Sequence, residues 1–296
     1  MKNNKFCFAI IIMFILSFLV SGCANSASNH AAPEVQNPSP AETAGLLKVH
    51  FIDVGQGDAI LVQTPNGQNM LVDAGENSQG DVMINYLLSQ GVNRLDIVVG
   101  THPHSDHIGG LDTVINRLPV KSIYMPKATN TTESFRDVLT AVKNQGLKIS
   151  TAKAGVDLPL DGLNCRFIAP VKDTYENFNN YSAVIKLDYG SQSFLLTGDA
   201  EAESEAQMLS SGIALKSTVL KVGHHGSSTS TSTKFLKAVA PQYAIIMLGR
   251  DNPYNHPHTQ TLTKLNKAGV KIYRTDQNGT IVFTTDGKDM QISQGR

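Results

Sequence analysis

Short apolar runs separated by turn residues dominate the sequence between residues 46 and 100, and this pattern is typical of β-strands joined by tight connections. The runs lie at residues 46–54, 58–64, 69–75 and 95–100. Because Gly-rich or Asn-Gly segments join the first three, we expect antiparallel hairpins. Between the third and fourth runs, residues 81–90 carry apolar side chains at helical spacing and end at Gly91, which predicts a helix.

The rest of the chain alternates predicted helices and strands. Helical spacing indicates helices at residues 111–118, 133–145, 200–209, 233–240 and 259–267. Apolar runs indicate strands at residues 165–168, 183–188, 193–197, 217–222, 243–248, 271–274 and 279–284. The chain begins with antiparallel strands, and the later helices would cover the outer faces of the sheets. This order predicts an α/β fold in which two packed sheets lie between helices.

The first 22 residues have the pattern of an export signal. Lys2 and Lys5 precede an apolar run without acidic residues at 6–20, and small residues follow it before Cys23. The run is shorter than the roughly 20 residues that a membrane-spanning helix needs, which favours a signal peptide. The string Leu-Val-Ser-Gly-Cys resembles a bacterial lipobox, which implies that Cys23 carries a lipid. The alternative is an uncleaved N-terminal anchor, and with either the protein is extracytoplasmic and attached to the cell membrane.

Residues 23–45 are rich in Ala, Ser, Asn and Pro and show no apolar period. This composition is typical of a flexible tether, and we expect His30 within it to be solvated. The folded domain then covers residues 46–296, with no internal repeat.

Composition and charge exclude some classes of function. The 296 residues contain 25 basic and 25 acidic side chains, so the formal net charge is zero. A protein that binds nucleic acid by neutralising many phosphates at once is strongly basic, and this chain is not. Three cysteines cannot build a disulfide scaffold. The absence of Trp and the low aromatic content argue against a stacking platform for single strands.

One segment carries dense metal-binding chemistry. Residues 102–107 read His-Pro-His-Ser-Asp-His and come directly after the predicted strand at 95–100. Side chains of alternate residues, His102 and His104, can point to one place, while Asp106 and His107 turn to a second. Mixed nitrogen and oxygen ligands of this kind suit Zn, Mn or Fe. If the segment only capped a following helix, its aspartate would be explained but its three histidines would not.

This HxHxDH segment resembles the signature of the metallo-β-lactamase superfamily, and four further segments agree with it in order along the chain. They are FIDVGQGDAI at 51–60, LVDAG at 71–75, FLLTGDAE at 194–201 and LKVGHHGSS at 220–228. Together they are similar to the metallo-β-lactamase-like domain of ComEC-type competence proteins, and to phosphorylcholine esterases of cell-wall teichoic acid. The resemblance spans about residues 46–283 and implies an αββα sandwich with two divalent metal ions, Zn or Mn.

The resemblance also implies a set of metal ligands. His102 and His104 would hold one ion, Asp106 and His107 would hold the other, and Asp199 would bridge the two. Asp199 has a simpler explanation as well, because an aspartate just before a predicted helix often caps that helix.

Two adjacent histidines, His224 and His225, follow a predicted strand. The resemblance implies that one of them completes the ligands of the second ion, but adjacent side chains diverge and the sequence does not decide which. The other is a candidate for binding substrate phosphate, and Ser227 in the same motif is a further candidate substrate contact. The alternative is a pair of core histidines.

The chain departs from the superfamily pattern in one place. Many members supply a further His ligand before a strand in the middle of the chain, whereas residues 177–182 contain no His. The first ion would then have an extra water or an Asn contact and would be held weakly. Asn180 and Ser182 are candidates for hydrogen bonds to substrate, with ordinary turn residues as the alternative.

Three further residues are candidates for supporting the site. ComEC-like domains have an Asn-x-x-x-His-Pro element similar to the one that contains His256, which makes this side chain a candidate proton donor or ligand, with a simple turn as the alternative. Asp53 and Asp73 are candidates for carboxylates that orient ligand imidazoles, or else turn residues. We expect His50 to be structural and His258 to lie at a helix start or on the surface.

The glycines of DVGQGD do not form a dinucleotide fingerprint, because the residues that follow them read as strand rather than helix. We expect Gly55 and Gly57 to form the tight turn of the first hairpin.

These residues predict metal-dependent hydrolysis. Two metals can hold a hydroxide near neutral pH and neutralise the oxygens around phosphorus, so we expect a phosphodiester substrate, with Asp106, His225 and His256 taking part in catalysis. The similarity favours a nuclease that acts on DNA. The alternatives are a phosphodiesterase that acts on teichoic acid or another cell-envelope polymer, a β-lactamase or lactonase, and an anchored binding protein with a degenerate metal site. The sequence does not identify a protein partner.

Overall fold

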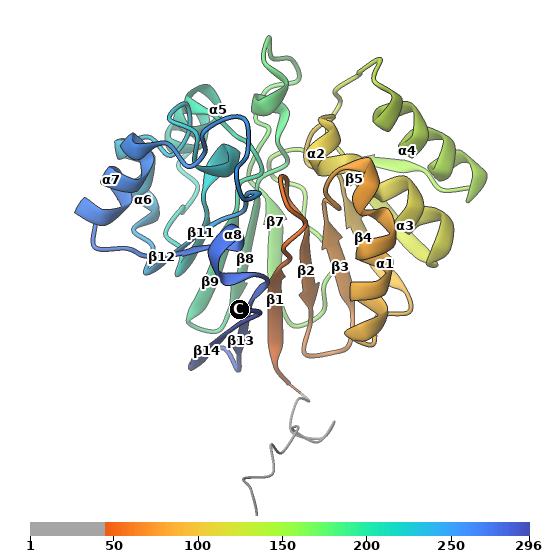
Figure 1. Cartoon of the computed structure of the whole chain (residues 1–296), viewed down its shortest axis with the longest axis horizontal. Coiled ribbons are helices and arrows are strands. Elements are labelled where there is room, and N and C mark those ends of the chain that lie inside the picture. The colour runs from red at the N-terminus through yellow and green to blue at the C-terminus, as the bar shows by residue number, and fades with distance from the viewer. Residues whose placement is uncertain (1–44) are drawn as a thin grey trace, which may run out of the picture. The chain divides into compact units, whose positions relative to one another are not determined.

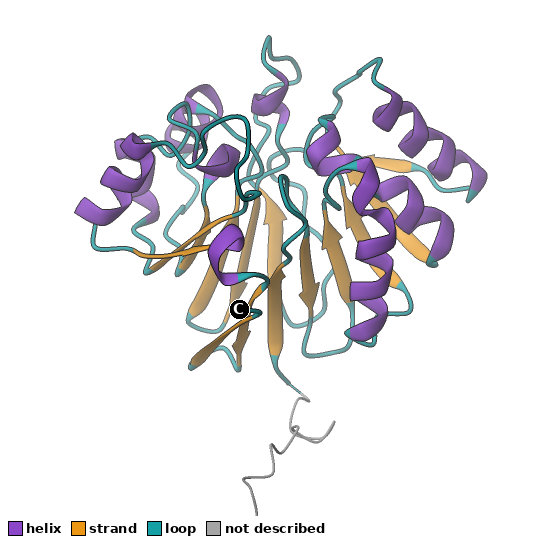
Figure 2. Cartoon of the chain, viewed as in Figure 1, coloured by secondary structure: helices purple, strands orange, loops and turns teal. Residues whose placement is uncertain are grey.

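The computed structural model describes residues 45–296, so the predicted signal peptide, Cys23 and the tether up to residue 44 lie outside the described residues. The described part has four layers, with helices on the outer face of each of two packed sheets (Figures 1 and 2). This αββα arrangement confirms the predicted fold class. Within residues 45–296, no helix is both long enough and apolar enough to cross a membrane.

The first sheet has eight strands in the described part of the chain. In spatial order they are β14 (Met290–Gln294), β13 (Ile281–Thr285), β1 (Leu47–Phe51), β2 (Ile60–Gln63), β3 (Asn69–Val72), β4 (Leu95–Val99), β5 (Val120–Met125) and β6 (Ile149–Thr151). The strands β1, β2 and β3 pair antiparallel, as the turn residues between them predict. From β3 to β6 the strands run parallel.

The second sheet has six described strands. In spatial order they are β12 (Lys271–Arg274), β11 (Tyr243–Ile246), β10 (Val219–Lys221), β9 (Gln192–Leu196), β8 (Ile185–Tyr189) and β7 (Asn164–Phe167). The strands β9 to β12 run parallel, whereas β7 and β8 are antiparallel to their neighbours. The carboxyl ends of β9, β10 and β11 therefore lie at one edge of this sheet.

Helices cover the outer faces of both sheets (Figure 2). On the first sheet they are α1 (Gly80–Ser89), α3 (Leu111–Arg117) and α4 (Glu133–Asn144), and on the second α5 (Ala202–Ser210), α6 (Thr233–Val239) and α7 (Thr259–Lys267). Shorter helical segments lie in the connections: α2 (Ser105–Ile108), α8 (Thr275–Asn278), η1 (Asn77–Gln79), η2 (Phe178–Tyr181) and η3 (Gly223–Gly226).

The largest cluster of buried hydrophobic side chains lies between the two sheets. Phe51, Phe194 and Phe283 meet there edge to face, with ring centroids 5.8 Å and 6.0 Å apart, and all three are buried. Fully burying one such side chain contributes about 1.5–3 kcal/mol. Two further buried clusters join each sheet to its own helices, so the sheets form a firm support for the loops at their edges.

The hydrophobic pattern misses three strands, β5, β6 and β14. The strand β5 has partly exposed positions along its length, β6 is three residues long, and β14 is a mainly exposed edge strand. Each is a strand because it pairs with a neighbour rather than because it carries a long apolar run.

The interior of the first sheet contains His50, in β1. Its ring is 1% exposed, and its Nδ1 lies 2.8 Å from the Tyr86 hydroxyl, in agreement with the expected structural role. Burial, and after it the charge of Lys48, lowers the pKa of His50 to about 4. The folded protein therefore keeps this imidazole neutral at a pH where the unfolded chain protonates it, below about 6.5.

We expect His50 to weaken the fold in acid. The pKa of His50 is lower in the folded protein than in the unfolded chain. The free energy of unfolding is therefore unaffected by this group above pH 6.5 and decreases by about 3 kcal/mol as the pH falls to 4. Urea unfolding of the parent and of His50→Gln at pH 7, 5.5 and 4.5 checks this. The free energy of unfolding should fall less steeply in the variant, with His258→Gln as the control. Equal slopes in parent and His50→Gln would contradict it.

Candidate metal centre

The predicted ligands lie in loops that follow the carboxyl ends of β4, β9 and β10, and loops after β3 and β11 adjoin them. Because these strand ends lie at one edge of the two packed sheets, residues far apart in the sequence come together there. In the view of Figure 1 this edge is at the top, beside α2 and α5.

Four side chains form the larger cluster, Asp106, His107, Asp199 and His225. His107 Nε2 lies 3.2 Å from Asp199 Oδ2, and His225 Nε2 lies 3.2 Å from Asp106 Oδ2. The two Nε2 atoms are 3.3 Å apart, and His225 Nε2 is 3.4 Å from Asp199 Oδ2. A tetrahedral ion with ligands at about 2.0–2.2 Å sets them about 3.3–3.6 Å apart. The spacing and the mixed donors therefore fit a divalent ion such as Zn or Mn.

A second cluster consists of His102, His104 and Asp199. His102 Nε2 lies 3.0 Å from His104 Nδ1 and 3.8 Å from Asp199 Oδ2. The same Asp199 oxygen thus belongs to both clusters, which is the position predicted for a bridging carboxylate. This cluster offers three ligands, and Ser182, from the segment that lacks the further His, lies 3.4 Å from the other ring nitrogen of His102.

The structure decides between the two explanations of Asp199. Helix α5 begins at Ala202, and the Asn180 side chain accepts hydrogen bonds from the backbone N–H groups of Glu201 (3.1 Å) and Ser204 (3.3 Å). Asn180 therefore caps the start of this helix from a distant loop and is buried, rather than open to substrate. The buried Asp199 carboxylate faces the imidazoles instead.

The adjacent histidines have different surroundings. His225 is buried in the larger cluster, and its Nδ1 donates to the Met247 carbonyl at 2.8 Å. His224 is partly exposed, with Nδ1 3.1 Å from Glu201 Oε1 and Nε2 3.9 Å from Asp199 Oδ2. Both residues have positive φ, 48° and 51°, a conformation that costs non-glycine residues energy and often occurs at functional sites. This turn makes His225 the candidate ligand and leaves His224 facing the cavity.

Asp73 supports the site as predicted, and Asp53 does not. Asp73 Oδ2 accepts from His107 Nδ1 at 2.8 Å, and the Asp73 carboxylate also accepts from the backbone N–H and the hydroxyl of Thr101. This arrangement directs His107 Nε2 at the cluster. Asp53 instead accepts from the Gly55 N–H at 3.2 Å and pairs with Arg296 at 2.7 Å, so for Asp53 the alternative of a turn residue is confirmed.

Two buried charges beside the site were not predicted, Asp58 and Lys221. Lys221 is 0% exposed, and its Nζ lies 2.6 Å from Asp58 Oδ2 and 3.7 Å from Asp199 Oδ1. It also donates to the Gly198 carbonyl at 2.9 Å. A lysine is almost never fully buried unless it is paired. The available sequence signal was a lysine at the end of an apolar strand, just before His224 and His225.

Gly57 has a function beyond the turn that was predicted for it. A Cβ at this position would lie 2.1 Å from the Asp106 carbonyl, and the next residue, Asp58, donates its N–H to that carbonyl at 3.1 Å. With φ at +126°, Gly57 also has a backbone conformation that other residues rarely adopt. Glycine therefore lets the first loop approach the ligand loop closely.

The carboxylates strongly perturb the imidazoles of the larger cluster. Burial alone would lower the pKa of His225, but the charge of Asp199 and the hydrogen bond to Asp106 raise it to about 9. The same kind of attraction raises the pKa of His107 well above its usual range, against the effect of burial. These nitrogens attract positive charge, and a cation that binds here must displace their protons.

A cavity of about 350 Å³ opens over the clusters. It is lined by Gln56, Pro103, His104, Ser105, Asp106, Thr132, Asp199, His224, His225, Tyr254 and His256. The predicted residue His256 thus reaches the site, with its ring 5.4 Å from that of His224. Burial, followed by the charges of His224 and His225, lowers the pKa of His256 to about 4, so it is neutral at pH 7. Its catalytic role stays a prediction.

Two predicted substrate contacts lie behind the site. Ser182 is fully buried and accepts from the Asp199 backbone N–H at 3.0 Å. Ser227 is buried too, with its hydroxyl 3.0 Å from that of Thr229. Neither side chain lines the cavity. Both hydroxyls hold the ligand loops in place.

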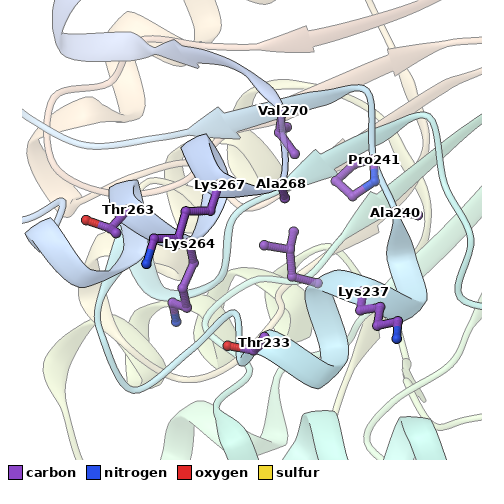
Figure 3. A pocket seen from close by; sticks show the side chains of 10 residues that line it. Thr233, Lys237, Ala240, Pro241, Thr263, Lys264, Lys267, Ala268 and Val270 are labelled. Carbon is purple, nitrogen blue, oxygen red and sulfur yellow. The ribbon is translucent and has the colours of Figure 1, made fainter.

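A larger hollow, of about 600 Å³, lies between α6 and α7 (Figure 3). Three lysines surround its apolar floor, Lys237, Lys264 and Lys267, and all lie in the last turns of these helices. Positive charge there stabilises the helix dipole, and Lys264 Nζ also donates to the Ser230 and Thr231 carbonyls. None of the candidate ligands lines this hollow, so we place the chemistry in the smaller cavity.

Comparison with known proteins agrees with this geometry. Residues 52–250 match the family model of the metallo-β-lactamase superfamily. The chain belongs to this superfamily. Its members are typically metal-dependent hydrolases, and this metallo-β-lactamase domain has a candidate site for such metals.

The relatives include competence proteins, as the motifs indicated. The domain is 34% identical over 253 residues to ComE operon protein 3 of Bacillus subtilis, an alignment that covers 80% of this chain and 33% of that protein. It is 34% identical over 254 residues to Recombination protein 2 of Haemophilus influenzae, an alignment that covers 84% of this chain and 30% of that protein. It is 32% identical over 233 residues to Competence protein ComA of Neisseria gonorrhoeae, an alignment that covers 78% of this chain and 31% of that protein. The chain thus spans about a third of the length of these relatives.

Solved structures show the same fold. The metallo-β-lactamase fold protein YhfI from Bacillus subtilis matches with a TM-score of 0.54 at 14% identity, covering 81% of this chain and 100% of that one. CmlA, a diiron β-hydroxylase from Streptomyces venezuelae, matches with a TM-score of 0.52 at 13% identity, and the match covers 77% of this chain and 52% of that one. At these identities the likeness concerns the fold alone.

Proposed function

We propose that this protein is a metal-dependent phosphodiesterase that acts as a nuclease on DNA. The observation that carries the proposal is the Asp199 Oδ2 atom shared by two histidine-rich clusters, which suits a pair of ions. Such a pair supplies Lewis-acid chemistry and activates water for attack on phosphorus. The names of the relatives refer to competence and recombination, which favours DNA over a cell-envelope polymer as substrate.

The residues around the clusters prepare the site for this reaction. Asp73 and the Met247 carbonyl hold His107 and His225 by their Nδ1 atoms, so that both Nε2 atoms face inward. Glu201 holds His224 by its Nδ1 atom in the same way, and the His224 side chain lines the cavity in which a substrate phosphate would lie. Neutral His256 completes this wall.

Metal analysis and substrate tests examine the proposal. We expect the purified protein to hold about two divalent ions per chain, and with Mn or Zn added to cleave single- or double-stranded DNA and bis-p-nitrophenyl phosphate. Cleavage of purified wall polymer but not of DNA would support the cell-envelope alternative. Two bound ions without cleavage of any phosphoester would contradict the proposal, and absence of bound metal would favour a binding protein.

We also propose that the protein works outside the cytoplasm on a lipid anchor at Cys23, which lies outside the described residues. A thioether-linked lipid needs the cysteine sulfur, so Cys23→Ser should move the protein from the membrane fraction to the soluble fraction without changing its rate of hydrolysis in solution. Fractionation and immunoblotting measure this. If Cys23→Ser stays in the membrane fraction, an uncleaved N-terminal helix is the anchor.

A further inference from the structure

We propose that Tyr254, supported from behind by His256, is a stacking subsite for one unpaired nucleobase of the substrate, next to the phosphate that is cleaved. This inference rests on the proposed function and adds how the substrate is recognised. It starts from the exposure of Tyr254. Five large apolar side chains are strongly exposed among the described residues, and of these only Tyr254, at 58%, lines the cavity over the metal clusters.

The ring of Tyr254 belongs to a series of nearly parallel rings. It stacks on His256 with centroids 5.7 Å apart and planes at 28°, and His256 stacks on His225 at 6.3 Å and 29°. The separations are within the range of offset aromatic stacking. The series runs from the exposed tyrosine to a candidate metal ligand, so a planar group bound on it would lie beside a phosphate at the metal centre.

The loop that carries Tyr254 and His256 is tied together by the side chain of Asn252. Its Nδ2 donates to the carbonyls of Gly249 (3.1 Å) and His256 (2.8 Å), and its Oδ1 accepts from the His256 N–H at 3.0 Å. Because both ends of the turn are tied, Tyr254 is presented to the cavity before any ligand arrives. A preorganised contact loses less entropy on binding.

The rest of the cavity gives little other means of holding a nucleic acid. None of the residues that line it is Lys or Arg, so the cavity wall itself offers no basic side chain to the backbone phosphates. Every base has a face that can stack on an aromatic ring, and such stacking is sequence-tolerant. Within a duplex the neighbouring base pairs cover these faces, and a single exposed tyrosine suits one unpaired base.

Binding of two small probes tests the subsite. With Mn²⁺ present, calorimetry compares dAMP with deoxyribose phosphate, which has the same phosphate and sugar but no base. We expect the parent protein to bind dAMP about tenfold more tightly, the scale of one base–aromatic stack. Tyr254→Leu should lose this preference with unchanged affinity for deoxyribose phosphate, whereas Tyr254→Phe, the matched control that keeps the ring, should retain it. Equal binding of both probes by the parent, or an unchanged preference in Tyr254→Leu, would overturn the subsite.

Cleavage kinetics separate this inference from the proposed function. On single-stranded DNA, Tyr254→Leu should raise KM about tenfold, and on the same strand with abasic residues flanking the cleaved linkage it should change KM little. If DNA is cleaved with a KM indifferent to Tyr254, the subsite is wrong and the nuclease stands. If DNA is not cleaved but the preference for dAMP depends on Tyr254, the subsite stands and the nuclease is wrong.

Discussion

Asp199→Ala should lower phosphodiester hydrolysis at least about a hundredfold, the scale of losing charge stabilisation of a transition state. Asp199 Oδ2 is the one atom that belongs to both clusters, 3.2 Å from His107 Nε2 and 3.8 Å from His102 Nε2. Removing this carboxylate therefore takes one ligand from each of the two proposed ions, and nothing then bridges them to fix the distance between them. The backbone at this position is held by Ser182, and the helix that follows is capped by Asn180, so the fold should persist.

Rate and metal content must be measured together for this variant. We expect Asp199→Ala to bind fewer ions than the parent, with an unchanged circular dichroism spectrum. Asp53→Ala provides a matched control, because it removes an aspartate whose partner is the exposed Arg296, and its rate should stay within about threefold of the parent since exposed ion pairs contribute little. An Asp199→Ala protein that binds metal normally and hydrolyses at the parent rate would show that Asp199 is no bridging ligand.

Lys221→Met should destabilise the fold by about 3–5 kcal/mol, the usual cost of removing one partner of a buried ion pair. Lys221 and Asp58 are both buried, with Nζ 2.6 Å from Oδ2. Without the ammonium group, the buried Asp58 carboxylate keeps only the more distant His225 Nδ1 (3.5 Å) and His107 Nδ1 (3.9 Å), and Asp199 Oδ1 loses its nearest positive neighbour. Adding Asp58→Asn removes the unpaired charge, so the double variant should recover part of the loss.

Urea unfolding of the parent, Lys221→Met and the double variant measures these differences. The chain offers a matched control in Lys186, a second buried lysine, whose partner Asp188 is 38% exposed. Because that carboxylate remains hydrated when the lysine is lost, Lys186→Met should cost less than Lys221→Met. A Lys221→Met protein within about 1 kcal/mol of the parent, the range of an exposed pair, would mean that the buried pair contributes little to stability.

Local spacing in the sequence was enough to find the elements and the first ligands. The helix at 259–267 and the strand at 271–274 have the same bounds in sequence and structure. The segment 102–107 could be identified because its ligands are close in the chain and follow a buried strand. Such features depend on side-chain periodicity and on contacts between near neighbours, which the order of residues determines directly.

Which side chain faces the metal centre was decided by the tertiary structure. His224 and His225 are equivalent in sequence, and a turn with positive φ on the loop after β10 separates them. Asn180 takes over the helix cap that Asp199 would otherwise provide, and Lys221 meets Asp58 across more than 160 positions of the chain. Each outcome depends on where two distant loops meet at the edge of packed sheets. The sequence of one loop does not show which distant loop it contacts, because the packing of the sheets and helices beneath sets the positions of both loops.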